Sequence, residues 1–443
     1  MNQSRIAVVG GGISGLAAAW LLSRRHHVTL FEGNDYLGGH TRTRDVPGAD
    51  GPVPVDTGFI VFNERNYPLL TGLFGHLGVA TRASDMSFAF RSADGRLEWA
   101  GDNLDKVFAQ RRNLLRPSFL RMVADVVRFN RGAKRFLAAG DGGEPTLAEF
   151  LDALHVSRAL RHQYLLPMAA AIWSCPPDDM LRFPARQFLQ FFRNHGLLDL
   201  ADRPLWRTVA GGGREYVRRL AAGISGGHHV GTPVRRIRRH AGGVELFADT
   251  GPAGVFDQVV VATHADQALG LLESPGYWEQ RLLGSFPYQR NDAWLHSDPR
   301  LMPRLRRVWA SWNYQAGDDS HAPSVTYWMN RLQGLAGTGN QFVTLNPATP
   351  PRPEATHEHT VFRHPVFDTA AIRAQAMMDR IQGQDRVWFC GSYLGYGFHE
   401  DGLRSAVRVA DAFGIRPPWH DAGATARETA PAPFIAAAEW QAP

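Results

Sequence analysis

The residues with the most recognisable chemistry stand at the start of the chain. Gly10, Gly12 and Gly15 follow a short apolar run and lead into an Ala/Leu-rich segment. Gly10 permits a tight turn, Gly12 lets the backbone approach a pyrophosphate, and Gly15 lets a helix and a strand pack closely. Glu32 lies 17 residues after Gly15, where a carboxylate can accept hydrogen bonds from both hydroxyls of an adenosine ribose. This spacing predicts a dinucleotide-binding site.

A strand–helix–strand unit is needed to position these residues. Residues 5–9 are typical of a strand buried in a parallel sheet, residues 16–23 of a helix, and residues 27–31 of a second strand that ends on Glu32. The N-terminus of such a helix offers free N–H groups and the positive end of its dipole to phosphates. Because all pieces occur in the right order, a simple Gly-rich turn is the weaker interpretation. This motif alone does not show whether the dinucleotide is NAD or FAD.

The next motif decides between the two cofactors. Gly38-Gly39-His40-Thr41-Arg42-Thr43 resembles the second half of the fingerprint in the superfamily of FAD-dependent amine oxidases and phytoene desaturases. The resemblance implies that Arg42 and the backbone near it reach the FAD diphosphate, and a planar guanidinium suits phosphate oxygens. Asp56-Thr57-Gly58 resembles the superfamily's turn near the flavin ring. The cofactor implied is FAD.

A C-terminal motif completes this resemblance. Residues 386–414 match the superfamily's flavin motif, with a buried strand up to Cys390, a glycine loop and a helix over 402–413. The resemblance implies that this helix points its N-terminus at the pyrimidine end of the flavin, where a positive dipole end stabilises negative charge. Ser392 departs from the pattern, because the superfamily usually has Asp or Glu there to hold the ribityl chain. That contact must be made differently here.

The predicted FAD contacts come from all of these segments, together with a valine and a strand end that resemble the superfamily's adenine contact and its closing strand. They are Gly10, Gly12, Ile13, Ser14, Gly15, Glu32, Gly33, Gly39, His40, Thr41, Arg42, Thr57, Gly58, Phe59, Val234, Thr263, Gly391, Ser392, Asp401, Gly402 and Leu403.

The order of motifs predicts an α/β fold with two interleaved domains. A Rossmann-like FAD-binding domain with a central parallel sheet is expected from residues 1–80, 205–270 and 384–416. A substrate domain of mixed sheet plus a helical block is expected from 81–204 and 271–383, and residues 417–443 are expected to form a loose tail. The segments 147–199 and 283–346 are rich in large aromatic side chains. These could be domain core or the wall of an apolar tunnel, and the sequence leaves both open.

Composition narrows the setting of the protein. The 443 residues include two cysteines, which is too few for a disulfide framework or a multi-cysteine metal site and suits a reducing cytosol. No metal site is predicted, since no His spacing is convincing for one. No signal peptide is expected before the first strand, and no apolar run is long enough to cross a bilayer. We therefore expect a cytoplasmic protein, peripheral at the inner face of a bacterial membrane.

Positive charge is concentrated in one segment. Residues 104–137 carry nine Lys/Arg and two Asp, whereas the whole chain has a net charge of +6. Apolar residues recur between the arginines at roughly helical spacing, and Pro117 should break or restart the helix. Such a segment can lie on an anionic membrane surface, which is the favoured interpretation. The alternative is a helix with its apolar face in the core and solvated arginines. No nucleic-acid reader motif accompanies it.

A closer resemblance suggests a substrate. Seven stretches resemble a bacterial subgroup of predicted NAD/FAD-binding flavoproteins, and members of that group are associated with enzymes that methylate or cyclopropanate phospholipid acyl chains. The stretches are 164–176, 191–198, 206–212, 262–269, 310–314, 343–347 and 395–406. The resemblance implies desaturation of a methyl-branched unsaturated fatty acyl chain, held in a phospholipid. Hydride transfer to flavin N5 and loss of a proton would give a conjugated diene.

Four residues are candidates for the catalytic site. His399, Glu400 and His195 could remove the proton, and Tyr396 could line the pocket or stack near the flavin. Glu400 and Asp401 could instead cap the C-terminal helix, which is the favoured interpretation for Asp401. A structural role is favoured for His195.

Two other classes of function stay open at this point. A polyamine or aromatic amine oxidase shares the fold, but such enzymes usually use a lysine near the flavin, and Lys106 and Lys134 both lie in the basic segment. A lipid isomerase or an accessory lipid-binding flavoprotein is the other alternative. A homodimer is compatible with each of these functions, including the lipid desaturase.

Overall fold

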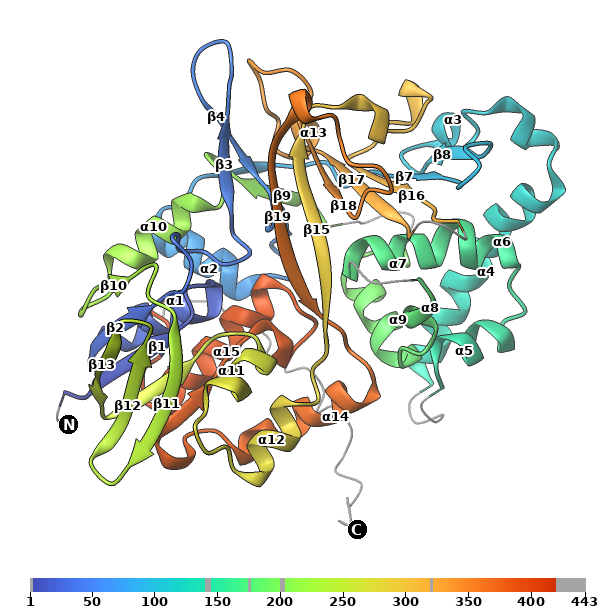
Figure 1. Cartoon of the computed structure of the whole chain (residues 1–443). Helices are drawn as coiled ribbons and strands as arrows, with labels where there is room; N and C mark the ends of the chain where they lie inside the picture. Colours follow the sequence, from blue (N-terminus) through green and yellow to red (C-terminus); the bar gives the residue numbers. More distant parts are fainter. Residues whose placement is uncertain (1–2, 140–144, 174–176, 200–203, 319–321, 420–443) are drawn as a thin grey trace.

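A five-stranded parallel sheet lies on the side of the molecule that carries the N-terminus (Figure 1). The computed structural model describes residues 3–139, 145–173, 177–199, 204–318 and 322–419. The strand order is β10-β2-β1-β14-β20, and every neighbouring pair is parallel. The strands are β1 (Arg5–Val9), β2 (His27–Phe31), β10 (His228–His229), β14 (Gln258–Val261) and β20 (Val387–Phe389). They come from three separated parts of the chain, so the sheet is complete only when all three meet.

Different layers cover the two faces of this sheet, because alternate residues of a strand point to opposite sides. Ile6 and Val8 pack towards four helices, whereas Ala7 and Val9 pack towards a small antiparallel sheet and three further helices. The first layer contains α1 (Ile13–Leu22), α2 (Pro68–Leu77), α10 (Arg214–Ala222) and α15 (His399–Ala412). The second contains β11 (Val234–His240), β12 (Gly243–Ala248), β13 (Gly251–Phe256), α11 (Ala265–Leu271), α12 (Tyr277–Leu283) and α14 (Thr369–Met377). This arrangement confirms the Rossmann-like α/β fold.

A seven-stranded mixed sheet forms the second domain, in the order β19-β15-β18-β17-β16-β7-β8. Only β16 and β7 pair in parallel within this sheet. Its strands are β7 (Phe88–Arg91), β8 (Glu98–Ala100), β15 (Tyr288–His296), β16 (Trp312–Gln315), β17 (Ser324–Trp328), β18 (Phe342–Leu345) and β19 (Thr356–Pro365). The dipeptide Asp94-Gly95 between the strand-like runs of residues 87–99 is typical of a hairpin turn, and β7 and β8 form this hairpin with Gly95 at φ +65°.

A block of helices packs on this mixed sheet and shares one apolar core with it (Figure 1). Its elements are α4 (Pro117–Ala138), α5 (Leu147–Ala153), α6 (Arg158–Leu160), a π-helical turn (Arg161–Leu165), α7 (Leu166–Trp173), α8 (Pro177–Leu181) and α9 (Ala185–Asn194). The basic segment begins with α3 (Leu104–Val107) and a 3-10 turn (Arg111–Leu115). Pro117 then starts α4 at its first position, where the missing N–H costs nothing. The predicted restart of the helix at Pro117 is confirmed.

Several short elements lie outside the two main sheets. They are the hairpin β3 (Thr43–Val46) and β4 (Val53–Asp56), the small sheet of β5 (Phe62–Asn63), β6 (Thr81–Ala83) and β9 (Trp206–Val209), and α13 (Met329–Leu332). Within the described residues, no helix combines the length and apolar composition needed to span a bilayer.

The start of the expected tail is anchored. Trp419 stacks on Trp20 with ring centroids 6.2 Å apart, so the expectation of a loose extension from residue 417 is wrong for its first residues. Residues 420–443 lie outside the described part of the chain.

Candidate active site

One cavity of about 1040 Å³ runs from the parallel sheet into the second domain. Sites for one small molecule measure roughly 300–1,000 Å³, so this space is large for a single ligand. Its walls include the glycine-rich loop after β1, the end of β2, the segment 38–42, β19 and the aromatic residues of the mixed sheet. The cavity therefore joins a nucleotide-binding end to an apolar end.

The loop after β1 presents free backbone groups to the nucleotide end. Gly12 is the N-cap of α1, and no side chain caps that helix. A Cβ built on Gly12 meets no atom within 4 Å, so a ligand can approach the backbone there. Gly10, with φ +105°, makes the turn that aims the helix at the cavity. An uncapped helix N-terminus beside open space is suited to a diphosphate.

Glu32 is held in place for a ribose. Its Oε2 accepts a hydrogen bond from the Gly11 N–H at 2.6 Å, and its Oε1 accepts from the backbone and side-chain amides of Asn34, both at 2.8 Å. The residue lines the cavity and is 7% exposed. These bonds fix the carboxylate, and its remaining lone pairs can accept from ligand hydroxyls.

Arg42 and His40 lie between the two ends of the cavity. Arg42 forms an ion pair with Glu358 at 2.9 Å, and its guanidinium lies over the Tyr36 ring, 5.1 Å from the ring centroid. Its buried Nε has no hydrogen-bond partner among the described residues, and the same holds for His40 Nε2. Buried polar atoms without a partner are costly, and a bound diphosphate would supply an acceptor for the N–H of Arg42 Nε. These residues fit FAD.

Three histidines meet in this central region. The ring of His40 lies 5.8 Å from that of His264 and 5.1 Å from that of His364. Burial lowers the pKa of His40 to about 4 and, together with the neighbouring charges, the pKa of His264 and His364 to about 3. All three are therefore neutral at pH 7 and offer hydrogen bonds rather than charge. Among the described residues, no cluster of His, Cys, Asp and Glu is arranged to hold a metal ion.

The far end of the cavity is apolar. Aliphatic and aromatic side chains from both domains line it, and they include Ile60, Val61, Tyr67, Met86, Ile172, Phe191, Leu197, Trp206, Trp312, Tyr327 and Leu345. The carboxylates among the described lining residues, Glu32 and Asp35, both lie at the nucleotide end. The aromatic segments 147–199 and 283–346, whose role the sequence did not decide, thus contribute both to the domain core and to the cavity wall.

His195 places an imidazole ring at this apolar end of the cavity. It follows α9 directly, lines the cavity and stacks on Phe191 with ring centroids 3.8 Å apart. Its Nδ1 lies 2.9 Å from the Phe191 carbonyl oxygen, which can only accept, so Nδ1 carries the proton and Nε2 keeps a lone pair. Burial lowers the pKa of His195 to about 4. The ring is therefore neutral at pH 7, with Nε2 free to accept a proton.

His399 also lines the cavity, but its ring is tied to its neighbours. It stacks on Phe59 at 3.8 Å, and its Nε2 lies 2.8 Å from Thr41 Oγ1 and 3.1 Å from the Tyr216 hydroxyl. Burial lowers its pKa to about 3. Its Nε2 is thus shared between two hydroxyls, which makes His399 better suited to positioning than to proton removal.

The other two catalytic candidates lie outside the cavity wall. Glu400 accepts hydrogen bonds from the backbone N–H groups of Leu69 and Leu70, both at 3.0 Å, and so caps α2. The prediction that Glu400 removes a proton is corrected by this placement. Tyr396 packs near Phe191, 5.9 Å between ring centroids, rather than lining the cavity.

Asp401 caps its own helix, as favoured from the sequence. Its Oδ2 accepts from the backbone N–H groups of Tyr396 and Phe398, both at 3.0 Å. The helix α15 accordingly starts at His399, three residues before the expected start at Gly402. The prediction that Asp401 contacts FAD is corrected, because the residue lies behind the cavity wall.

Four further predicted FAD contacts support the site from outside the cavity wall. A Cβ on Gly15 would lie 1.8 Å from the Gly10 carbonyl oxygen, and one on Gly402 would lie 2.8 Å from Ser14 Oγ. Both glycines therefore serve close packing. Leu403 is fully buried in the core, and Thr41 bonds Tyr216 and His399. The remaining predicted contacts line the cavity, and they are Gly10, Gly12, Ile13, Ser14, Glu32, Gly33, Gly39, His40, Arg42, Thr57, Gly58, Phe59, Val234, Thr263, Gly391 and Ser392.

Several cavity residues carry no sequence motif. Phe362, Arg363 and His364 on β19 line the cavity beside Tyr288 and His264. The ring of His264 stacks on that of Tyr288, with centroids 4.5 Å apart. Only the pairing of β19 with β15 places the β19 residues here, and that pairing has no local signal.

A dinucleotide-binding sheet joined to a large, partly apolar cavity suits a flavin-dependent oxidoreductase. Residues 13–413 match the family described as "Flavin containing amine oxidoreductase", so the chain belongs to that family and its cofactor is FAD. The glycine-rich loop after β1, Glu32 and Arg42 would hold the bound FAD.

Relatives and solved structures extend this comparison. The chain is 28% identical over 264 residues to a putative flavin-containing monoamine oxidase, AofH, of Mycobacterium tuberculosis, covering 56% of this chain and 54% of that protein. It is 30% identical over 275 residues to a carotenoid phi-ring synthase of Streptomyces griseus, covering 55% and 49%. The chain thus spans about half the length of these relatives.

The fold is shared with enzymes of different names. A CLA-producing fatty acid isomerase from P. acnes superposes with a TM-score of 0.67 at 16% identity, covering 93% of this chain and 99% of that one. Cyclohexylamine oxidase from Brevibacterium oxydans gives a TM-score of 0.65 at 16% identity, covering 93% and 100%. At this identity the likeness shows the fold.

Proposed function

We propose that the protein is an FAD-dependent oxidoreductase that dehydrogenates a methyl-branched unsaturated fatty acyl chain. The acyl chain is part of a phospholipid. The observation that carries the proposal is the apolar end of the cavity, whose described lining residues include neither a carboxylate nor a lysine. A protonated amine would find no counter-charge there, whereas a hydrocarbon chain would bury its surface against aliphatic and aromatic groups. FAD, when bound, would supply the hydride acceptor.

His195 gives this apolar end a proton acceptor. An acyl chain with an alkene beside a methyl-branched carbon has a tertiary allylic C–H bond, and loss of hydride there leaves an allylic cation. A neighbouring C–H bond then breaks, its proton passes to His195 Nε2 and its electron pair forms the second double bond. The hydrogen bond from Nδ1 to the Phe191 carbonyl holds the ring in the required tautomer. The surrounding rings of Phe191, Trp206 and Phe398 exclude water.

The family also contains amine oxidases, and the fold is shared by a fatty acid isomerase. These two activities are therefore the alternatives to be tested. An amine oxidase would reduce its cofactor with an amine. An isomerase would move the double bond and leave the substrate with all its hydrogens.

Anaerobic reduction of the bound FAD tests the proposal. The holoenzyme is mixed with liposomes that contain methyl-branched unsaturated phospholipid, with liposomes of plain unsaturated phospholipid, or with putrescine, and the flavin absorbance is followed. We expect bleaching with the branched lipid alone and a product that lacks two hydrogens. His195→Gln should slow the bleaching, while His229→Gln, an exposed histidine on β10, should leave it unchanged.

Each other outcome has a definite meaning. Bleaching by putrescine would assign the protein to the amine oxidases. A product of unchanged mass would assign it to the isomerases, and bleaching by plain lipid would remove the requirement for a methyl branch.

A further inference from the structure

The basic segment has a second apolar surface, distinct from the one buried in the core. Phe119, Met122 and Phe129 of α4 face inward and are 2%, 2% and 0% exposed. These side chains therefore belong to the domain core and are not available to a membrane. Other apolar residues point outward, with Leu115 87% exposed and Leu104 73% exposed.

These outward residues are concentrated at one corner of the molecule. Of the ten strongly exposed large apolar side chains in the described chain, five lie between residues 104 and 127, namely Leu104, Leu114, Leu115, Leu120 and Val127. They belong to α3, the 3-10 turn after it and the first half of α4, at one extremity of the fold (Figure 1). Leu120, Ala124 and Val127 share one outward face of α4, because their spacing is that of successive helical turns. Exposed apolar residues gathered in this way mark an interaction surface.

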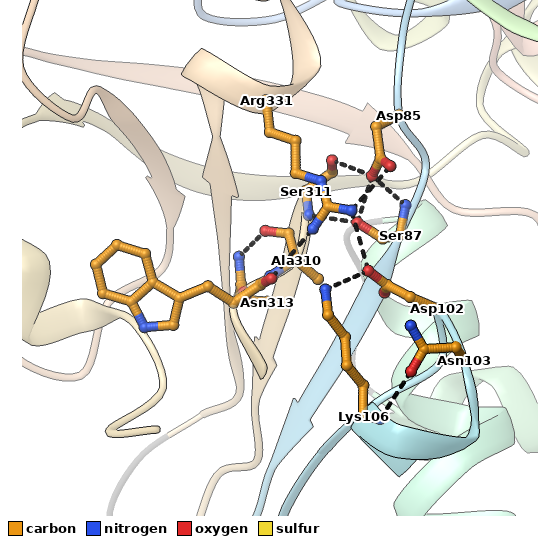
Figure 2. A network of polar contacts seen from close by, with 10 residues as sticks. Asp85, Ser87, Asp102, Asn103, Lys106, Ala310, Ser311, Asn313 and Arg331 are labelled. Carbon is orange, nitrogen blue, oxygen red and sulfur yellow. Dashed lines mark hydrogen bonds and ion pairs between the residues drawn. The ribbon is translucent and has the colours of Figure 1, made fainter. Parts of the chain in front are cut away.

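The corner is held rigidly by the polar network shown in Figure 2. Asp102 pairs with Lys106 at 2.5 Å and with Arg331 at 3.0 Å, and Arg331 also pairs with Asp85 at 3.0 Å. The Asn103 side chain caps α3 by accepting from the Lys106 N–H at 2.9 Å. This network ties α3 to the mixed sheet. Leu104 is therefore presented on a fixed turn.

Exposed arginines accompany the leucines: Arg112 precedes Leu114, and Arg131 and Arg135 lie further along the face of α4 that carries Leu120. Arg112, Arg131 and Arg135 are exposed and form no ion pair with any described residue. The acidic side chains within 104–137 are already engaged, because Asp105 pairs with Arg111 and Arg307 and Asp125 is buried beside Arg128. The corner thus combines an apolar tip with a surplus of arginines, which is complementary to phospholipid headgroups above an acyl layer.

We propose that the corner formed by residues 104–127, with the arginines of α4 beside it, docks on the surface of an anionic lipid bilayer. The five exposed apolar side chains enter the boundary between headgroups and acyl chains, and the arginines contact lipid phosphates. The proposal does not depend on which substrate the cavity takes. It orients the protein on a bilayer through residues that have no part in the cofactor site.

Vesicle co-sedimentation of the full-length holoprotein tests the proposal. The vesicles contain phosphatidylcholine alone or phosphatidylcholine and phosphatidylglycerol in equal parts. We expect binding to the anionic vesicles, weakened by added salt, and little binding to the neutral ones. Replacing both Leu114 and Leu115 by serine should weaken binding at least tenfold, since one buried leucine is worth about a factor of ten or more.

A matched control is available in the same chain. Leu205 is 86% exposed, like Leu115, but lies outside the corner, so Leu205→Ser should bind vesicles as the wild type does. The flavin absorbance and melting temperature of each variant confirm that it is folded, and no substrate is needed. Equal binding by the Leu114/Leu115 variant, or no binding by the wild type, would overturn the proposal. Leucine-dependent self-association without vesicle binding would assign the corner to a protein interface instead.

Discussion

Replacing Gly12 by alanine separates the stability of the protein from its affinity for FAD. Gly12 has φ −74° and ψ −177°, a conformation that any L-residue adopts. An added Cβ meets no atom within 4 Å, so the methyl group has room in the cofactor-free protein. Because alanine restricts the unfolded chain, we expect the free energy of unfolding of the cofactor-free variant to rise by about 0.4–1 kcal/mol.

The same methyl group stands where a dinucleotide would approach the backbone. Gly12 lines the cavity at the uncapped start of α1. A hydrogen bond from a backbone N–H to a charged phosphate oxygen contributes about 1.5–3 kcal/mol. Loss of one such bond should weaken FAD binding by about 10- to 150-fold. The substitution is thus expected to stabilise the empty protein and to weaken its cofactor complex.

Two measurements on the cofactor-free protein check this pair of effects. Thermal unfolding reports stability, and titration with FAD, followed by the quenching of its fluorescence, reports affinity. Gly15→Ala is the matched control, because its Cβ would lie 1.8 Å from the Gly10 carbonyl oxygen and should destabilise the empty protein. Wild-type FAD affinity in Gly12→Ala would refute the conclusion that the backbone at Gly12 approaches the diphosphate.

Three other predictions follow from contacts already described. Glu400→Gln should leave the rate of flavin reduction close to that of the wild type, because Glu400 caps α2 outside the cavity; a large loss of rate would restore its catalytic role. The pH profile of flavin reduction should stay flat down to about pH 5 and fall near pH 4, because His195 must be neutral and its pKa is lowered to about 4; an acid limb near 6.5, the ordinary value for histidine, would contradict this environment. Trp419→Ala should lower the free energy of unfolding by about 1–3 kcal/mol through lost packing on Trp20, and an unchanged melting temperature would show that this contact is not stabilising.

The cofactor end of the site could be predicted from the sequence because its parts are close together in the chain. Gly10, Gly12 and Glu32 belong to one strand–helix–strand unit, and the geometry of such a unit is fixed by local packing. The structure places all three on the cavity wall. The hairpin at 87–99 and the restart at Pro117 were predictable for the same reason, since turn residues and proline act locally.

The catalytic end was harder to predict because its contacts are distant in sequence. Nothing near Glu400 indicates that its carboxylate caps a helix that begins at Pro68. Periodicity likewise showed that α4 has an apolar stripe, but Phe119 faces inward only because the helical block and the mixed sheet pack against it. The outward position of Leu115 follows from that packing. Such choices depend on tertiary partners rather than on propensity.

The closing elements of the FAD-binding sheet have a consequence for biosynthesis. β20 pairs with β14, and Gly402 of α15 packs against Ser14 of α1, although these partners lie far apart in the sequence. A ribosome that has made only the first two thirds of the chain has released α1 without α15, and the wall formed by Gly391 and Ser392 does not yet exist. The complete cofactor site therefore forms only after the last segment has been translated. Until then the side of α1 that packs on α15 stays uncovered, and exposed apolar surface of this kind makes a nascent chain dependent on chaperones.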